Sequence, residues 1–132
     1  MILRYVIPMN PVSKKNHQMI LRKADGTPFI AQSKQYRIYE QTAALYLTPK
    51  PARPVSDPVN VRCVFYMGSR RRCDLTNLEA AAHDILVRSG ILADDNRDII
   101  ATTDGSMVLY DKGAPRTEIE ITDVDGWEKW HG

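Results

Sequence analysis

The chain has 132 residues, of which 43% are hydrophobic and 26% are charged, and its formal net charge is +2. This composition is typical of one compact domain with an ordinary core, and it excludes a disordered or fibrous chain. No apolar run approaches the roughly 20 residues of a membrane helix, and the first residues resemble a strand and not a signal peptide. We therefore expect a cytoplasmic protein without membrane contacts. The net charge is too small to identify a polyanionic partner, so the placement of the charges matters more.

The first part of the chain predicts a strand followed by a hairpin. Apolar residues alternate over residues 3–7, which is the pattern of a half-buried strand. Two further apolar segments, residues 19–23 and 28–31, flank an Asp-Gly pair at residues 25 and 26. Asp-Gly between apolar segments is a strong hairpin signal.

A helix is expected next, because Ser33 is a suitable N-cap and Pro49 ends the helical pattern. Residues 49–58 contain four prolines and are interpreted as an extended internal loop, not a domain boundary. The apolar residues of the expected helix recur at helical spacing: Tyr36, Tyr39, Ala43, Tyr46 and Leu47.

The second half of the chain predicts a strand, a helix and more strands. Strict alternation over residues 59–67 indicates the clearest strand of the sequence. A helix should begin near Thr76, end near Ser89 and stop at Gly90. Its buried face would consist of Leu78, Ala81, Ala82, Ile85 and Leu86.

Three strands should complete the domain, at residues 99–103, 107–110 and 117–121. This order of elements favours an α+β fold, a single small domain in which a mixed β-sheet is covered by two main helices. We assign residues 1–122 to this domain and residues 123–132 to a C-terminal tail. Cys63 and Cys73 have no zinc-binding spacing, so both are expected to be free thiols in a reducing compartment.

Basic and acidic residues meet between the clearest strand and the second helix. Arg70, Arg71 and Arg72 stand next to Asp74, and Asp94 and Asp95 follow one helix later. Hydrolysis of a phosphodiester needs an ion, usually Mg²⁺, that activates water and neutralises the leaving oxygen, and carboxylates are its preferred ligands. Asp74, Asp94 and Asp95 are therefore candidate metal ligands. The arginines are candidates for binding the phosphates beside the cut.

The geometry of the expected second helix adds a candidate site residue and raises a problem of distance. Asn77, Ala80 and Asp84 share a stripe away from the core face, so Asp84 could point to the same site. A helix of about 13 residues is roughly 20 Å long, however, and five or six extended residues span at most about 20 Å. Asp95 reaches Asp74 within one chain only if residues 91–93 run straight back along the helix. Otherwise a second subunit would have to complete the site.

At these residues the chain resembles the RusA family of Holliday-junction resolvases. The family pattern has basic residues, then Asp-x-Asp-Asn-Leu, a lysine three residues after the asparagine, an aspartate on the same helix and a closing Asp-Asp pair. The segment after the first strand, residues 11–17, also looks like the Pro-Pro-Ser-Lys-Asn segment of the family. The matching residues of the main motif are Arg70, Arg71, Arg72, Asp74, Asn77, Leu78, Asp84, Asp94 and Asp95.

The resemblance implies a homodimeric, Mg²⁺-dependent endonuclease, with Mn²⁺ as a possible substitute, that resolves four-way or branched DNA in recombination and repair. Such proteins are common in phages and prophages. Asp74 and Asp95 would hold the metal, and Asp94 and Asp84 would assist. The implied DNA-binding residues are Arg70, Arg71, Arg72, Lys14, Lys15 and Asn16.

Two departures from the family pattern lie at the centre of the motif. Thr76 stands where the second aspartate is expected, and Ala80 stands where the lysine is expected. The loss of a carboxylate should weaken metal binding, because a neutral oxygen attracts a divalent ion less than a carboxylate does. A branched-DNA-binding protein with a decayed nuclease site is therefore the second hypothesis, and a small dimeric interaction protein is the third.

Each candidate also has a structural interpretation. Thr76 and Glu79 have the spacing of a capping box, which alone explains both residues. Residues 94–96 would ordinarily form a solvated turn, and consecutive arginines a solvated loop. His17 and His83 are expected to be structural, and Trp127 and Trp130 to dock the tail on the body of the protein or on a partner subunit.

Overall fold

A mixed five-stranded sheet forms the base of the protein in the computed structural model, which describes residues 1–14 and 18–124. The strand order is β1-β7-β4-β5, and β6 also pairs with β4. The pairs β1 with β7 and β7 with β4 are antiparallel, whereas β5 and β6 run parallel to β4. The bounds of the strands are Ile2–Ile7 for β1, Val59–Met67 for β4, Ile100–Thr102 for β5, Met107–Tyr110 for β6 and Arg116–Asp123 for β7.

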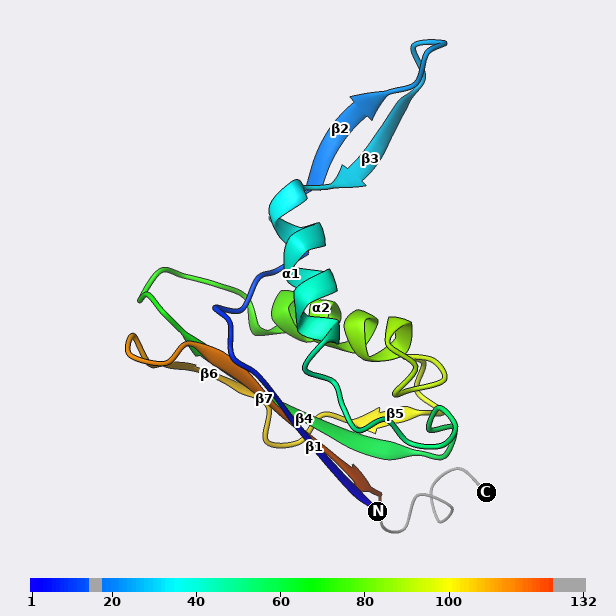
Figure 1. The fold of residues 1–132 in the computed structure, drawn as a ribbon, viewed down its shortest axis with the longest axis vertical. Helices are drawn as coiled ribbons and strands as arrows, with labels where there is room; N and C mark the ends of the chain where they lie inside the picture. The colour runs from blue at the N-terminus through cyan, green and yellow to red at the C-terminus, as the bar shows by residue number, and fades with distance from the viewer. Residues whose placement is uncertain (15–17, 125–132) are drawn as a thin grey trace.

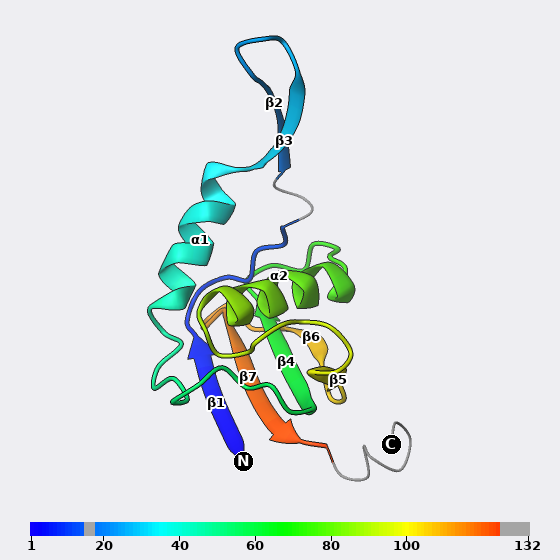
Figure 2. The ribbon, with the colours of Figure 1, turned by 90° about the vertical axis from the view of Figure 1, so that its right-hand side faces the viewer.

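Two helices lie on one side of this sheet, which confirms the predicted α+β class (Figures 1 and 2). The second helix, α2 (Leu75–Arg88), lies across the sheet, and α1 (Lys34–Ala44) rises beside it. The hydroxyl of Ser33 accepts a hydrogen bond from the Tyr36 N–H at 3.1 Å, which confirms the predicted N-cap of α1.

The predicted extension of α1 to Leu47 was wrong, because the helix ends at Ala44. The next residues turn more tightly: the Tyr46 N–H donates to the carbonyl of Ala43, and the Leu47 N–H to that of Ala44. Leu47 is nevertheless fully buried, whereas Tyr46 is 44% exposed. The apolar spacing therefore located the buried residue correctly but not the end of the helix.

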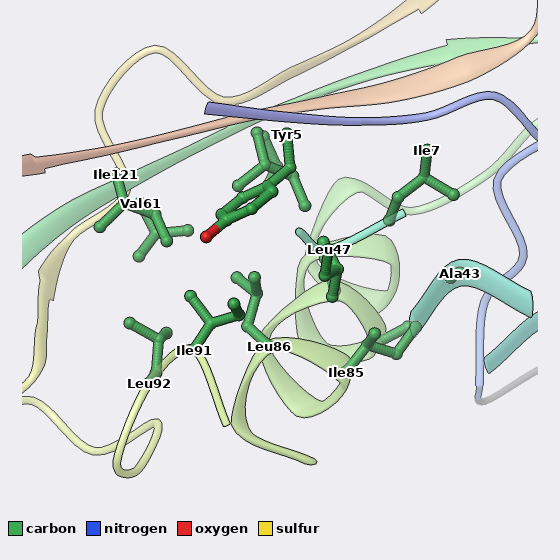
Figure 3. Close-up of a cluster of buried hydrophobic side chains, with 14 of the residues drawn as sticks. Tyr5, Ile7, Ala43, Leu47, Val61, Ile85, Leu86, Ile91, Leu92 and Ile121 are labelled. Carbon is green, nitrogen blue, oxygen red and sulfur yellow. The ribbon is translucent and has the colours of Figure 1, made fainter. Parts of the chain in front are cut away.

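The core fills the space between α2 and the covered face of the sheet (Figure 3). Alternation along the strands places Tyr5, Val61 and Ile121 on this face, where they meet Ile85 and Leu86 of α2. The five residues predicted to form the buried face of α2 are all buried. Burial of this face fixes α2 on the sheet, and therefore fixes the direction of the residues on its exposed stripe.

A two-stranded hairpin, β2 (Gln18–Arg22) with β3 (Pro28–Gln32), projects away from the sheet and the helices (Figures 1 and 2). Gly26 in its turn has φ +88°, a backbone conformation that glycine adopts without strain. The directly paired Ile20 and Ile30 are 75% and 67% exposed. The predicted hairpin is confirmed, and it carries an uncovered apolar surface.

The remaining predictions on the fold concern the loops, the cysteines and the membrane. Residues 49–58 form an internal loop, as predicted. Val55 in this loop makes an isolated bridge to Leu92, which was not predicted. Cys63 and Cys73 are free thiols. Within the part of the chain that the structure describes, no helix is long and apolar enough to cross a membrane.

Candidate functional site

The first candidate ligand, Asp74, is the N-cap of α2, with extended backbone angles of φ −94° and ψ 124°. Its carboxylate makes no capping hydrogen bond to the helix backbone but accepts one from the side-chain amide of Asn77, at 3.1 Å. Asp74 is exposed. The start of α2 therefore presents a carboxylate that is oriented by a neighbouring side chain and open to solvent.

The capping box predicted for Thr76 and Glu79 was wrong, because α2 begins before Thr76. The helix starts at Leu75, and Thr76 lies exposed in its first turn. Both Asp74 and Thr76 are good N-cap residues, and the chain leaving β4 enters the helix at the earlier one. Thr76 is thus free of any capping role and lies two residues from the candidate ligand.

Three exposed arginines precede Asp74 in the loop of residues 68–73 that connects β4 to α2. The guanidinium carbon of Arg70 lies 4.1 Å from the ring centroid of Tyr110, a cation–π arrangement that ties the loop to the end of β6. None of the three arginines pairs with a carboxylate among residues 1–14 and 18–124. Their charges are available to an anionic ligand.

The second acidic segment, which contains Asp94 and Asp95, is held at the other end of α2. The Ile91 N–H donates to the carbonyl of Leu86 at 3.0 Å, and the Ala93 N–H donates to that of Val55 at 2.9 Å. Figure 1 shows the segment between α2 and β5 at the end of α2 opposite to the arginine loop. A helix of 14 residues is about 21 Å long, and this segment leaves α2 at the end away from Asp74.

Within this segment the two aspartates form a compact turn. The Asp95 N–H donates to the Asp94 carboxylate at 2.7 Å, and the Asn96 side chain donates to the same carboxylate at 3.3 Å. Both aspartates are exposed. Burial lowers the pKa of His83, and the negative charge of Asp95 raises it in part. Asp95 is therefore close enough to act electrostatically on His83, which lies in the second half of α2.

Asp84 takes part in a chain of ion pairs. Its carboxylate lies 3.3 Å from the Lys14 ammonium and 3.1 Å from the Arg88 guanidinium, and Arg88 reaches Glu40 of α1 at 3.1 Å. Lys14 and Asp84, predicted to bind DNA and to assist the metal, thus neutralise each other. Lys15, Asn16, His17, Trp127 and Trp130 lie outside the described residues.

Residues 8–122 match the family model of the endodeoxyribonuclease RusA. The chain belongs to the RusA family. The match begins after β1 and covers both helices, the strands β2 to β6, nearly all of β7 and both acidic segments, and it confirms the resemblance inferred from the motif around Asp74. RusA-family proteins are nucleases that act on Holliday-junction DNA. No curated protein matched the chain.

This RusA-family member has side chains of the type that binds Mg²⁺, but its described residues do not gather three or more of them at one place. Asp74 and Asp95 offer the oxygen ligands that Mg²⁺ prefers, and Mg²⁺ is commonly bound by one or two carboxylates together with substrate phosphates. Within the described ranges, no group of three or more His, Cys, Asp or Glu side chains could hold an ion.

Sequence reasoning missed two features beside the RusA motif. Tyr110 supports Arg70, and residues 10–13 line a hollow next to the arginine loop. The sequence did place Tyr110 at the end of a predicted strand, at residues 107–110. Its proximity to the loop depends on the parallel pairing of β6 with β4, which places Tyr110 opposite Met67. That pairing is not readable from local periodicity.

Proposed function

We propose that the chain is a metal-dependent endonuclease that hydrolyses phosphodiester bonds in four-way or branched DNA. The observation that carries this proposal is the start of α2. There the exposed carboxylate of Asp74, which Asn77 orients, follows one residue after three exposed arginines. These arginines have no carboxylate partner among the described residues. Guanidinium groups bind phosphate in a bidentate manner, so they would hold the DNA backbone beside the carboxylate.

The proposed metal is Mg²⁺, with Mn²⁺ as a substitute, held by Asp74 and Asp95. When bound, such an ion supplies an activated water and neutralises charge on the leaving oxygen. Asp94 would orient Asp95 through the hydrogen bond to its backbone. Asp84 would act as a positioning residue, because its ion pair holds Lys14 next to α2. Lys15 and Asn16 are proposed to contact DNA together with the arginines.

We further propose that the active form is a homodimer in which one copy supplies Asp74 and its partner supplies Asp95. Support comes from the positions of the two acidic segments at opposite ends of α2 (Figure 1). In a two-fold dimer the two ends of one helix can face the opposite ends of the other, which yields two equivalent sites. Two sites related by symmetry also suit paired nicks in opposing strands of a junction.

Cleavage of a synthetic four-way junction tests the enzyme. We expect nicking that requires Mg²⁺ and is lost in Asp74→Asn, a substitution that preserves size and removes the charge. Asp104→Asn is the matched control, because Asp104 is exposed and lies in the turn between β5 and β6. Equal cleavage by the wild type and Asp74→Asn would overturn the assignment of Asp74.

A branched-DNA-binding protein without nuclease activity is the second candidate, and the exposed Thr76 and Ala80 favour it. They leave the first turns of α2 without the carboxylate and the ammonium of the family pattern. Tight junction binding without cleavage in Mg²⁺ or Mn²⁺ would identify this function. No preference for branched over linear DNA would exclude both candidates.

A further inference from the structure

A hollow of about 550 Å³ lies beside the arginine loop, between this loop and the segment that follows β1. We call it the 10–13 pocket, after Asn10, Pro11, Val12 and Ser13, which line it. Arg71, Arg72 and Cys73 of the arginine loop, Leu78 of α2 and Met67 of β4 also line it. Its volume falls within the range of about 300–1,000 Å³ that is typical of sites for small organic groups.

Two segments that line the 10–13 pocket approach each other closely at Gly68. The Gly68 N–H donates to the side-chain oxygen of Asn10 at 2.8 Å. A Cβ at position 68 would lie 3.1 Å from that oxygen and 3.0 Å from the side chain of Pro115. A larger residue would therefore push the segments apart. Glycine at this position keeps residues 10–13 and the arginine loop at a fixed separation.

One buried polar group of the lining has no partner within the described residues. Ser13 is only 7% exposed, and its hydroxyl makes no hydrogen bond in that part of the chain. Because the oxygen itself is buried, it contacts a ligand in the pocket only if its side chain shifts. Gln35 of α1 and Ser69 supply two polar side chains at the same hollow.

The lining combines three kinds of surface that a nucleotide matches. Pro11, Val12 and Met67 offer apolar contact for a flat ring, the polar side chains can bond to the edge of the ring, and Arg71 and Arg72 can bind the attached phosphates. Arg70 is engaged by Tyr110 on the other side of the loop. A phosphate alone would leave the apolar wall uncovered, and a paired base is not accessible because its edge and faces are occupied.

We propose that the 10–13 pocket receives one unpaired base of branched DNA while Arg71 and Arg72 hold its flanking phosphates. The proposal rests on the proposed action on branched DNA and adds the feature of the substrate that the protein recognises. Branched DNA offers such bases because pairing and stacking are interrupted at the branch. The binding energy of the pocket then favours DNA with an unstacked base over continuous duplex.

Three linear DNA duplexes test the pocket, with binding measured in EDTA so that cleavage does not occur. The first is fully paired, the second carries one unpaired nucleotide, and the third carries the same nucleotide without its base. Because contacts of one base with protein are worth about 1–3 kcal/mol, we expect the second duplex to bind about fivefold tighter than the third, or more. Equal binding of the second and third duplexes would overturn the proposal.

Filling the pocket should remove this difference. Val12→Trp places an indole in the hollow, and we expect it to bind the second and third duplexes equally. Val6→Trp is the matched control, since Val6 is 49% exposed on β1 and does not line the pocket. It should keep the preference for the base. A preference that survives in Val12→Trp would contradict the proposal, and Gln35→Ala, which should weaken the preference, replaces Val12→Trp if that variant does not fold.

Binding by an arginine variant and by the wild type distinguishes an error in the proposed pocket from an error in the proposed function. Arg71→Gln should weaken binding of all three duplexes by a similar factor, because a phosphate contact is independent of the base. Binding and cleavage of a four-way junction without any preference for the base would refute the pocket alone. Binding of neither the junction nor the unpaired nucleotide above paired duplex would refute the pocket and the proposed function together.

Discussion

Thr76 marks the position at which this chain departs from the acidic motif of its family. The first turn of α2 contains no acidic residue, and Thr76 is exposed in that turn, two residues after Asp74. Thr76→Asp should raise the rate of junction cleavage, because a second carboxylate strengthens the attraction for a divalent ion. It should also stabilise the protein by about 0.3–1 kcal/mol through the helix dipole.

Cleavage rates in Mg²⁺ and denaturant unfolding measure the two effects of Thr76→Asp. Thr76→Asn is the control, because it changes the shape in the same way without the charge. An unchanged cleavage rate in Thr76→Asp would show that another group already fills the role of the missing carboxylate.

His83 reports the position of Asp95 independently of catalysis. Burial lowers the pKa of His83, and the charge of Asp95 raises it in part. Asp95→Asn should therefore lower the pKa of His83 further, as measured by NMR titration of the imidazole. Asp98→Asn is the matched control: Asp98 is exposed in the same segment and is not among the charges that shift His83. Equal pKa values in the wild type and Asp95→Asn would place Asp95 away from α2.

The same lowered pKa predicts how stability changes with pH. The unfolded chain protonates His83 near its ordinary pKa of about 6.5, whereas the folded chain does so only at lower pH. In this window the unfolded state binds more protons, so the free energy of unfolding should fall as the pH falls below about 6.5. Urea unfolding at several pH values should show a smaller decrease in His83→Gln. An identical pH dependence in both proteins would contradict a buried neutral His83.

At the scale of elements, the end of α2 determines where the second acidic segment goes. Gly90 has φ +79°, and a Cβ built there would meet no atom within 4 Å. Gly90→Ala should therefore destabilise the protein by about 1–2 kcal/mol, entirely through the left-handed backbone conformation. Gly113 has no such conformation and one ordinary contact at 3.6 Å, so Gly113→Ala should change stability little. Equal unfolding midpoints of the two variants would contradict this reading of the helix end.

The elements themselves were predictable where local spacing determines them. The buried face of α2 and the alternation of β4 follow from a single segment each, and both are as predicted. The order of the sheet was not predictable, because β1 pairs with β7 and Ile2 lies opposite Thr122, at the other end of the domain. Such pairings depend on packing between distant segments, which the periodicity of a single segment does not predict.

The same distinction applies to the candidate site. Arg72, Asp74 and Asn77 are neighbours in sequence, so their proximity followed from the motif. The course of the segment after α2 depends on the hydrogen bonds that residues 91 and 93 make with Val55, a residue of the proline-rich loop. This contact joins segments that are distant in the sequence, so local patterns did not predict it.

At the scale of the whole molecule, the proposed dimer would take part in the chemistry. If one copy supplies Asp74 and its partner supplies Asp95, a mixed dimer of Asp74→Asn and Asp95→Asn contains one site with both substitutions and one site with neither. Each variant alone has one substitution in both of its sites. We therefore expect each purified variant to be inactive on a four-way junction and their mixture to regain activity after subunit exchange.

The regained activity should consist of single nicks, because only one of the two sites in a mixed dimer is intact. Nicks and paired cuts are distinguished by labelling both opposing strands of the junction. Sedimentation after one variant with a large fusion tag is mixed with the other variant verifies that the 15.0 kDa chain exchanges between dimers, because the mixed dimer then has an intermediate mass. Within a single chain the outcome would be reversed: if Asp74 and Asp95 of one copy formed each site, every site of the mixed dimer would carry one substitution. A mixture that stays inactive despite exchange would therefore return both ligands to one subunit and require the segment after α2 to move toward Asp74.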